Sequence, residues 1–281
     1  MQVVRSANEM QATSIGLRSE GKLIGFVPTM GYLHEGHLAL VDAAKEKTDF
    51  VVLSIFVNPT QFGVGEDLES YPRDLDRDLK LAEERGVDLV FAPEAEEMYP
   101  CGYSTYVEET EAAQGLCGVS RPIHFRGVTT VCAKLFNLCR PDVLVLGQKD
   151  AQQTVILRRM VEDLHFPVEV VAIPTVREPD GLAMSSRNAY LDEKQREDAL
   201  LIVKALEAGK ALVREKDIRN VDRVKAEVVN TLTVGRWVRM NYVEIVDRDT
   251  MRPESEIEPE RSQIVVAVWV GDVRLLDNVL L

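Results

Sequence analysis

Histidine and cysteine are scarce in this sequence, with four of each among 281 residues. No apolar run approaches the ~20 residues that a membrane-spanning helix needs, and the first residues lack the basic segment and following apolar stretch of a secretory signal. We therefore expect a cytoplasmic protein that does not engage a membrane.

Positive charge is also in short supply, since 33 Lys and Arg residues stand against 46 Asp and Glu residues, a formal net charge of -13. Nucleic-acid binding requires a basic face that displaces counterions from phosphates. The sequence therefore favours small-molecule substrates over DNA or RNA.

The cysteines form no C-x-x-C pair of the kind that indicates zinc or a redox couple. Cys132 and Cys139 lie on an apolar stripe with helical spacing, which favours packing as free thiols. Metal binding and catalysis are the alternatives for the group, which also includes Cys101 and Cys117.

Apolar runs alternate with amphipathic stretches through the first two thirds of the chain. Runs bounded by turn residues are typical of strands buried on both faces of a parallel sheet, and 3.6-residue periodicity indicates helices between them. We predict strands at 23–27, 50–57, 87–93, 142–147 and 168–173, and helices at 36–47, 74–86, 128–139 and 151–164. This series indicates an α/β fold, a Rossmann-like, open and mainly parallel sheet with helices on both faces.

The alternation of predicted strands and helices ends after residue 175. Two helical stretches, 192–215 and 219–232, precede two strand-like runs, 237–247 and 263–270. We therefore expect a Rossmann-like nucleotide-binding domain at 1–175 and a smaller C-terminal α+β domain at 176–281.

Ligands of open parallel sheets bind at the carboxyl ends of the strands. Three unusual stretches follow predicted strands there, and a fourth spans the expected domain boundary: "PTMGYLHEGH" from Pro28, "NPTQFG" from Asn58, "GQKDAQQ" from Gly147 and "MSSRN" from Met184. The topology predicts that they converge.

His34 and His37 share one face of a helix start, where backbone N–H groups and the helix dipole favour an anion. A phosphate chain fits such a place. Zinc is the rival ligand, but H-E-G-H is one residue shorter than H-E-x-x-H. Two half-exposed histidines that cap a loop are the third interpretation.

The other stretches are individually ambiguous. Lys149 is either a solvated lysine or a mobile cation for phosphate, and Asp150 either caps a helix, orients that lysine or approaches Mg²⁺. Arg187 carries a planar fork that suits phosphate oxygens, although "MSSRN" is also an ordinary turn. Amide-bearing residues suited to a small polar acid are Asn58, Gln61 and Gln153.

Together, "PTMGYLHEGHLALV", "FVNPTQF", "YPRDLDRDL", "HFRGV", "KLFNLCRPD", "LGQKDAQQ" and "PTVREPDGLAMSSRNAYL" resemble the pantothenate synthetase, or pantoate–β-alanine ligase, family. The resemblance runs in order over most of residues 22–190. It implies a nucleotidyltransferase-like Rossmann domain, with "HEGH" as the counterpart of HIGH and "MSSRN" as that of KMSKS. It also implies condensation of pantoate with β-alanine through pantoyl-adenylate, with ATP as co-substrate, Mg²⁺, a C-terminal domain that acts as a lid, and a homodimer.

The resemblance also implies residue roles. His34, His37 and Lys149 are the expected catalytic residues, and Asn58, Gln61 and Gln153 are expected to hold pantoate. The metal ligands are not specified by the motifs. The residues expected around ATP are Pro28, Thr29, Met30, His34, His37, Gly147, Lys149, Asp150, Val176, Met184, Ser185, Ser186 and Arg187.

Three positions depart from the family pattern: Cys101, Ile123 and Gln148. None of them carries an expected phosphate or pantoate contact. Two other functions compete with the ligase: another HIGH-type nucleotidyltransferase, and an ATP-binding regulatory module without chemistry. The candidate acid-binding residues argue against a pure nucleotide sensor.

Overall fold

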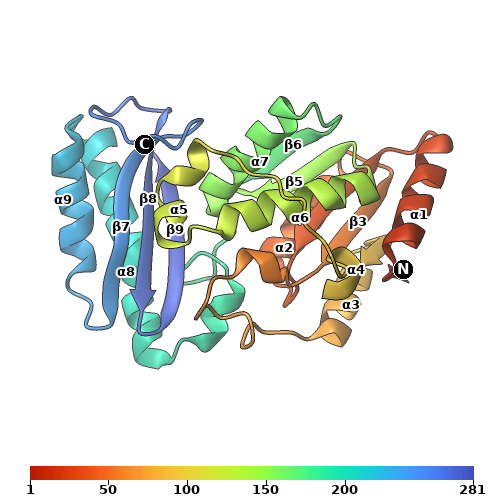
Figure 1. Ribbon diagram of the computed structural model, residues 1–281. Coiled ribbons are helices and arrows are strands. Elements are labelled where there is room, and N and C mark those ends of the chain that lie inside the picture. Colours follow the sequence, from red (N-terminus) through yellow and green to blue (C-terminus); the bar gives the residue numbers. More distant parts are fainter. The chain divides into compact units, whose positions relative to one another are not determined.

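The computed structural model describes every residue from Met1 to Leu281, and they form two compact units (Figure 1). Unit 1 comprises Met1–Thr110, Arg121–Gln148 and Ile156–Pro174. Unit 2 comprises Glu111–Ser120, Lys149–Val155 and Thr175–Leu281. The smaller unit thus takes in two short segments that precede residue 175.

The sheet of unit 1 has six strands, and every pair of neighbours is parallel. The apolar runs of the sequence form its central strands, as predicted. The strands are β1 (Gln2–Val4), β2 (Ile24–Thr29), β3 (Phe50–Ile55), β4 (Leu89–Phe91), β5 (Val143–Gly147) and β6 (Glu169–Ile173).

The spatial order of these strands is β1-β4-β3-β2-β5-β6. From β2 the chain winds outward through β3 and β4, and it then returns to place β5 on the other side of β2, where Gly25 pairs with Val143. β2 and β5 therefore flank the topological switch point, where doubly wound sheets bind their ligands. The predicted Rossmann-like fold is confirmed.

Alternate residues of the strands face two separate apolar layers. Phe26 and Leu144 pack into the cluster that includes α1, α6 and the later part of α7, whereas Val27 and Val145 pack into the cluster of α2 and α3. Helices thus cover both faces of the sheet, as Figure 1 shows. The helices are α1 (Ala7–Ser19), α2 (Glu35–Lys45), α3 (Leu75–Glu84), α4 (Ala95–Met98), α6 (His124–Cys139) and α7 (Ala151–Asp163), of which α7 starts in unit 2 and ends in unit 1.

Unit 2 contains an antiparallel sheet in the order β7-β8-β9, with two long helices packed against it (Figure 1). Apolar side chains of the helices and strands form one core, and a second cluster joins the first turns of α7 to β7 and β8. The elements are β7 (Val238–Asp247), β8 (Ser262–Val270), β9 (Val273–Leu280), α8 (Glu193–Arg214), α9 (Val221–Leu232) and the short α5 (Cys117–Ser120).

The prediction that the cysteines serve packing is confirmed for some of them but not for all. Cys132 and Cys139 are free thiols inside the core of unit 1, where burial raises the pKa of Cys132 to about 12. Cys101 is exposed, so packing does not explain this residue. None of the helices combines the length and apolar character needed to cross a bilayer.

Candidate active site

The loop after β2 turns sharply before α2 begins. Gly31 has φ +86° and Tyr32 has φ +50°, a conformation that glycine adopts readily and a tyrosine rarely. A Cβ on Gly31 would lie 3.0 Å from the Asp78 carboxylate and from Ile55. The motif "MGYLH" therefore requires its glycine at this turn.

Asp78 of α3 holds this loop in place. Its carboxylate is buried and accepts hydrogen bonds of 2.7 Å from the backbone N–H groups of both Tyr32 and Leu33. Burial raises the pKa of Asp78, although the two backbone hydrogen bonds oppose the rise. No sequence motif predicted this role, because a carboxylate on an amphipathic helix is normally solvated; the leucine spacing of α3 gives no sign that Asp78 is buried.

His34 and His37 form a reciprocal cap on α2. His34 is the N-cap, and its Nδ1 accepts a hydrogen bond of 3.1 Å from Gly36 N, while Nδ1 of His37 accepts one of 3.4 Å from His34 N. The two rings stack with centroids 4.0 Å apart. Because a backbone N–H can only donate, each Nδ1 is an acceptor, and the neutral ring carries its proton on Nε2. Both rings thus have an Nε2–H donor at the N-terminus of α2.

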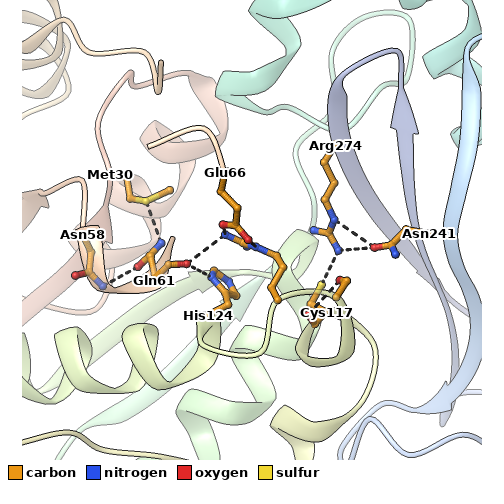
Figure 2. A network of polar contacts seen from close by, with 10 residues as sticks. Met30, Asn58, Gln61, Glu66, Cys117, His124, Asn241 and Arg274 are labelled. Atoms are coloured by element: carbon orange, nitrogen blue, oxygen red, sulfur yellow. Dashed lines mark hydrogen bonds and ion pairs between the residues drawn. The ribbon is translucent and has the colours of Figure 1, made fainter. Parts of the chain in front are cut away.

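The stretch after β3 forms the 3₁₀ turn η1, Pro59–Gln61, which Asn58 caps. Asn58 is buried: its Nδ2 donates to Gln61 Oε1 at 3.0 Å and to Gly127 O at 3.1 Å, and its Oδ1 accepts from the Tyr99 hydroxyl at 2.8 Å. Gln61 Nε2 in turn contacts Met30 Sδ at 3.1 Å, as Figure 2 shows. The structure therefore brings the ends of β2 and β3 together through Gln61 and Met30.

Helix α6 supports this turn at very close range. A Cβ on Gly127 would lie 2.5 Å from Thr60 O and 2.6 Å from the Gln61 backbone, so only glycine fits. Nδ1 of His124 lies 3.0 Å from Gln61 O (Figure 2). Arg121 both donates to Gln61 O and pairs with Glu66. Burial raises the pKa of Glu66, but Arg121 outweighs this effect and holds it below its ordinary value.

Lys149 and Asp150 follow Gly147 along the chain and belong to unit 2, where both are half-buried. The next turn of α7 is anchored by Gln152, whose amide N donates to Ala112 O and Gly115 O at 2.8 Å. Gln153 is half-buried beside it. Gln152, for which the sequence predicted no role, thus fixes the start of α7 to the segment 111–120.

The segment from Val176 to Met184 is a tight hairpin of unit 2. Arg177 pairs with Ala183, and Met184 N donates to Val176 O at 3.0 Å. The hairpin leads into Ser185, whose hydroxyl accepts a hydrogen bond of 3.3 Å from Arg187 N and caps the 3₁₀ turn η4, Ser186–Tyr190. The stretch "MSSRN" therefore does form a turn, and Ser185 is its N-cap.

A second polar network of unit 2 surrounds Cys117. Its thiol lies 3.2 Å from the Tyr242 hydroxyl. The thiol also accepts a hydrogen bond of 3.3 Å from Arg274, which in turn donates to Asn241 (Figure 2). Burial is the main reason that the pKa of Tyr242 is raised. Cys117 therefore has polar partners in addition to its packing.

The strand ends of unit 1 thus present a capped helix start with two imidazoles, next to a rigid amide-bearing turn. Such a sheet and edge define a Rossmann-like α/β protein of the nucleotide-binding type. The family model "Pantoate-beta-alanine ligase" matches residues 2–280. The chain belongs to the pantoate–β-alanine ligase family, and it is accordingly an enzyme of pantothenate biosynthesis, a carbon–nitrogen ligase.

Known proteins resemble the chain over its whole length. Pantothenate synthetase of Thermotoga petrophila is 51% identical over 281 residues, which cover 100% of both chains. The crystal structure of pantothenate synthetase from Thermus thermophilus has a TM-score of 0.92 at 45% identity, covering 99% of each chain. The pantoate–β-alanine ligase of Francisella tularensis, complexed with β-γ ATP and β-alanine, has a TM-score of 0.82 at 33% identity, covering 100% of this chain and 97% of that one.

Proposed function

We propose that this ligase joins pantoate to β-alanine in two steps, through pantoyl-adenylate. In the first, a carboxylate oxygen of pantoate bonds to the α-phosphorus of ATP, and the bond from that phosphorus to the bridging oxygen breaks, which releases pyrophosphate. In the second, the amine of β-alanine attacks the acyl carbon, AMP leaves and the nitrogen loses a proton. The family membership and the relative from Francisella tularensis, whose complex holds an ATP compound and β-alanine, support this reaction.

The first step needs positioning and charge neutralisation rather than a general base, because a carboxylate with a pKa near ~4 is already ionised at neutral pH. The single observation that carries the proposal is the orientation of the two imidazoles: their Nδ1 atoms are engaged by the cap of α2, so Nε2–H is the donor of each ring. Donors fixed at a helix N-terminus stabilise charge that builds on phosphate oxygens.

The remaining nucleotide contacts are assigned by position in the family motifs. We propose that Lys149 supplies a mobile positive charge to the phosphates and Arg187 a planar fork, with Ser185 and Ser186 as hydroxyl donors. Pro28, Thr29 and Met30 are proposed to line the active site, with Gly147, Val176 and Met184 around the nucleotide.

Pantoate is proposed to bind Gln61 and Gln153, with Asn58 beside them. The side-chain amide of Asn58 is already hydrogen-bonded to Gln61, Gly127 and Tyr99, so its principal contribution is to hold Gln61. The second amide contact would come from Gln153.

The residues present also fit Mg²⁺ in one particular way. No group of three His, Cys, Asp or Glu side chains is arranged to hold a metal ion. Mg²⁺ typically keeps several waters and binds through substrate phosphates with one or two carboxylates, so the proposed ion arrives with ATP and Asp150 is its candidate carboxylate. Such an ion would neutralise phosphate charge. We further propose a cytoplasmic homodimer in which residues 176–281 act as a lid.

The test is pantoate-dependent exchange of labelled pyrophosphate into ATP, measured with Mg²⁺ and without β-alanine. Exchange that requires pantoate would establish reversible adenylate formation. His37→Ala and Lys149→Ala should each lower it on the order of 100-fold or more, the scale of a transition-state charge partner. A folded, ATP-binding sample without exchange would contradict the pathway and favour a different acceptor acid.

A further inference from the structure

Strand β9 carries two adjacent polar residues that are almost completely buried. Asp277 is 2% exposed and Asn278 is 6% exposed, although β9 is the edge strand of its sheet. Burying such groups is unfavourable unless they are hydrogen-bonded. Asn278 is bonded to Lys149, and Asp277 is bonded to the hairpin that leads into Ser185.

Asn278 is bonded to the main chain of Lys149. Its Nδ2 donates to Lys149 O at 2.9 Å, and its Oδ1 accepts from Nε2 of Gln263 on β8. The lysine side chain is long and flexible, so what positions its ammonium group is the place of its backbone. The hydrogen bond from Asn278 fixes that place relative to the sheet of unit 2.

Asp277 is bonded to the hairpin that precedes the serines. Its carboxylate accepts two hydrogen bonds from Arg177, of 2.6 and 3.1 Å, and a third of 2.8 Å from the backbone N–H of Asn278. Arg177 also donates to Gly181 O at 3.1 Å, within the turn of the hairpin. The turn η4, which begins at Ser186, packs beside β9 as well.

We propose that Asp277 and Asn278 position the side chains that bind the phosphates of ATP. Asn278 acts through the backbone of Lys149, and Asp277 acts through Arg177. This inference rests on the proposed function, in which Lys149 and the segment Ser185–Arg187 bind the phosphates of ATP. Two segments far apart in sequence are thereby held on neighbouring residues of one strand, so that their cations and hydroxyls keep a fixed separation. A misplacement of about 1 Å is enough to cost a reaction roughly 100-fold.

The decisive experiment is a double-mutant cycle in the full chain, with pantoate-dependent pyrophosphate exchange as the readout. Asn278→Ala should lower the maximal exchange rate about 10- to 100-fold. In the Lys149→Ala background, the same change should lower it less than about twofold, because the positioned group is already gone. The KM for β-alanine should be unchanged in Asn278→Ala. A general loss of structure would change this KM as well as the exchange rate.

Ser262→Ala is the matched control. Ser262 is fully buried on the neighbouring strand β8, and it is bonded to Glu254 and Glu258 rather than to either phosphate-binding segment. Ser262→Ala should lower the melting temperature and leave exchange unchanged.

Asp277→Asn keeps the shape of the side chain and removes its charge. It should raise the KM for ATP, because it weakens the bond that holds the hairpin.

The failures can be told apart. Wild-type exchange in Asn278→Ala, in a protein that Lys149→Ala does impair, would overturn the positioning role alone. An equal loss from Asn278→Ala with and without Lys149 would overturn it too, since the effect would then not pass through the lysine. Wild-type exchange in Lys149→Ala itself would overturn the proposed role of Lys149 and this inference together.

Discussion

The imidazole rings of His34 and His37 lie face to face, 4.0 Å apart, and each one accepts a backbone hydrogen bond at the start of α2. Each ring therefore combines two functions in one side chain. Nδ1 caps the helix, and Nε2–H is the donor proposed to bind phosphate.

Substitution by asparagine separates the two functions of His34. The amide oxygen of Asn stands near the position of Nδ1, so His34→Asn should keep the cap and lose the Nε2–H group. We expect stability close to wild type and pyrophosphate exchange about 100-fold lower. His34→Ala should lose as much exchange and about 1 kcal/mol of unfolding free energy in addition, the usual value of an N-cap. Urea unfolding and exchange on both variants test this; wild-type exchange in His34→Asn would contradict the phosphate role.

Tyr99 supports the proposed pantoate site through Asn58. Burial raises the pKa of Tyr99 to about 12, so its hydroxyl remains a donor to Asn58 Oδ1 throughout the neutral range. Tyr99→Phe should lower stability by about 1 kcal/mol, because Asn58 Oδ1 loses one donor and keeps the Thr60 hydroxyl at 2.9 Å. The KM for pantoate should rise while the KM for ATP stays the same. Steady-state kinetics with each substrate varied in turn would show the difference, and an equal rise in both would count against the assignment.

Gly127 allows α6 to touch the turn that carries Gln61. Gly127→Ala should displace this turn, since its new methyl group would lie 2.5 Å from Thr60 O, and we expect a loss of about 1–3 kcal/mol together with weaker pantoate binding. Gly16→Ala in α1 is the control, because a Cβ there meets nothing within 4 Å. It should be neutral or stabilising by up to ~1 kcal/mol. Thermal unfolding and the KM for pantoate are the measurements, and similar behaviour of the two variants would refute the steric argument.

The hairpin before the serines depends on ionised carboxylates. Arg196 donates to Glu178 and Asp180, each at 2.6 Å. Burial raises the pKa of both carboxyl groups, but the hydrogen bonds from Arg196 outweigh it, and both pKa values lie below their ordinary 4.5 and 3.8. Their contribution is therefore complete above the ordinary values and is lost as the pH falls through the lower, folded values.

Arg196→Leu should consequently destabilise the protein at pH 7, by about 1 kcal/mol for partly exposed pairs, and progressively less as the pH falls below the ordinary pKa values of the two carboxyl groups. Unfolding curves of wild type and variant across the acid range test this. A stability difference that is independent of pH would show that the arginine acts through packing instead.

Most of the fold could be predicted from the sequence, because burial on both faces of a parallel sheet leaves continuous apolar runs such as Phe50–Ile55. β9 was missed. Its apolar pattern breaks at Asp277 and Asn278, whose burial is made possible by Arg177 and Lys149, residues that no local window contains. β9 is the strand proposed to organise the phosphate-binding residues, in keeping with the tendency of local rules to fail at functional positions.

The sequence indicates the candidate site through its residue types but not through the tertiary contacts that hold those residues in place. The imidazole pair and the amide-rich turn stand out as motifs, and Gln61 and Met30 do meet at the sheet edge. Asp78 and Gln152 look like ordinary helix residues. Only tertiary contacts reveal that they fix the backbone of "GYL" and of the segment 111–120.

The bonds made by β9 also bear on how the molecule folds. The bond from Asn278 to Lys149 closes a loop of 129 residues, and that from Arg177 to Asp277 closes one of 100. Contacts so distant along the chain are entropically expensive to close, and they form slowly compared with helices. During refolding, competence to bind nucleotide should therefore appear after most of the far-ultraviolet circular dichroism has returned, which would make nucleotide binding a marker of completed folding.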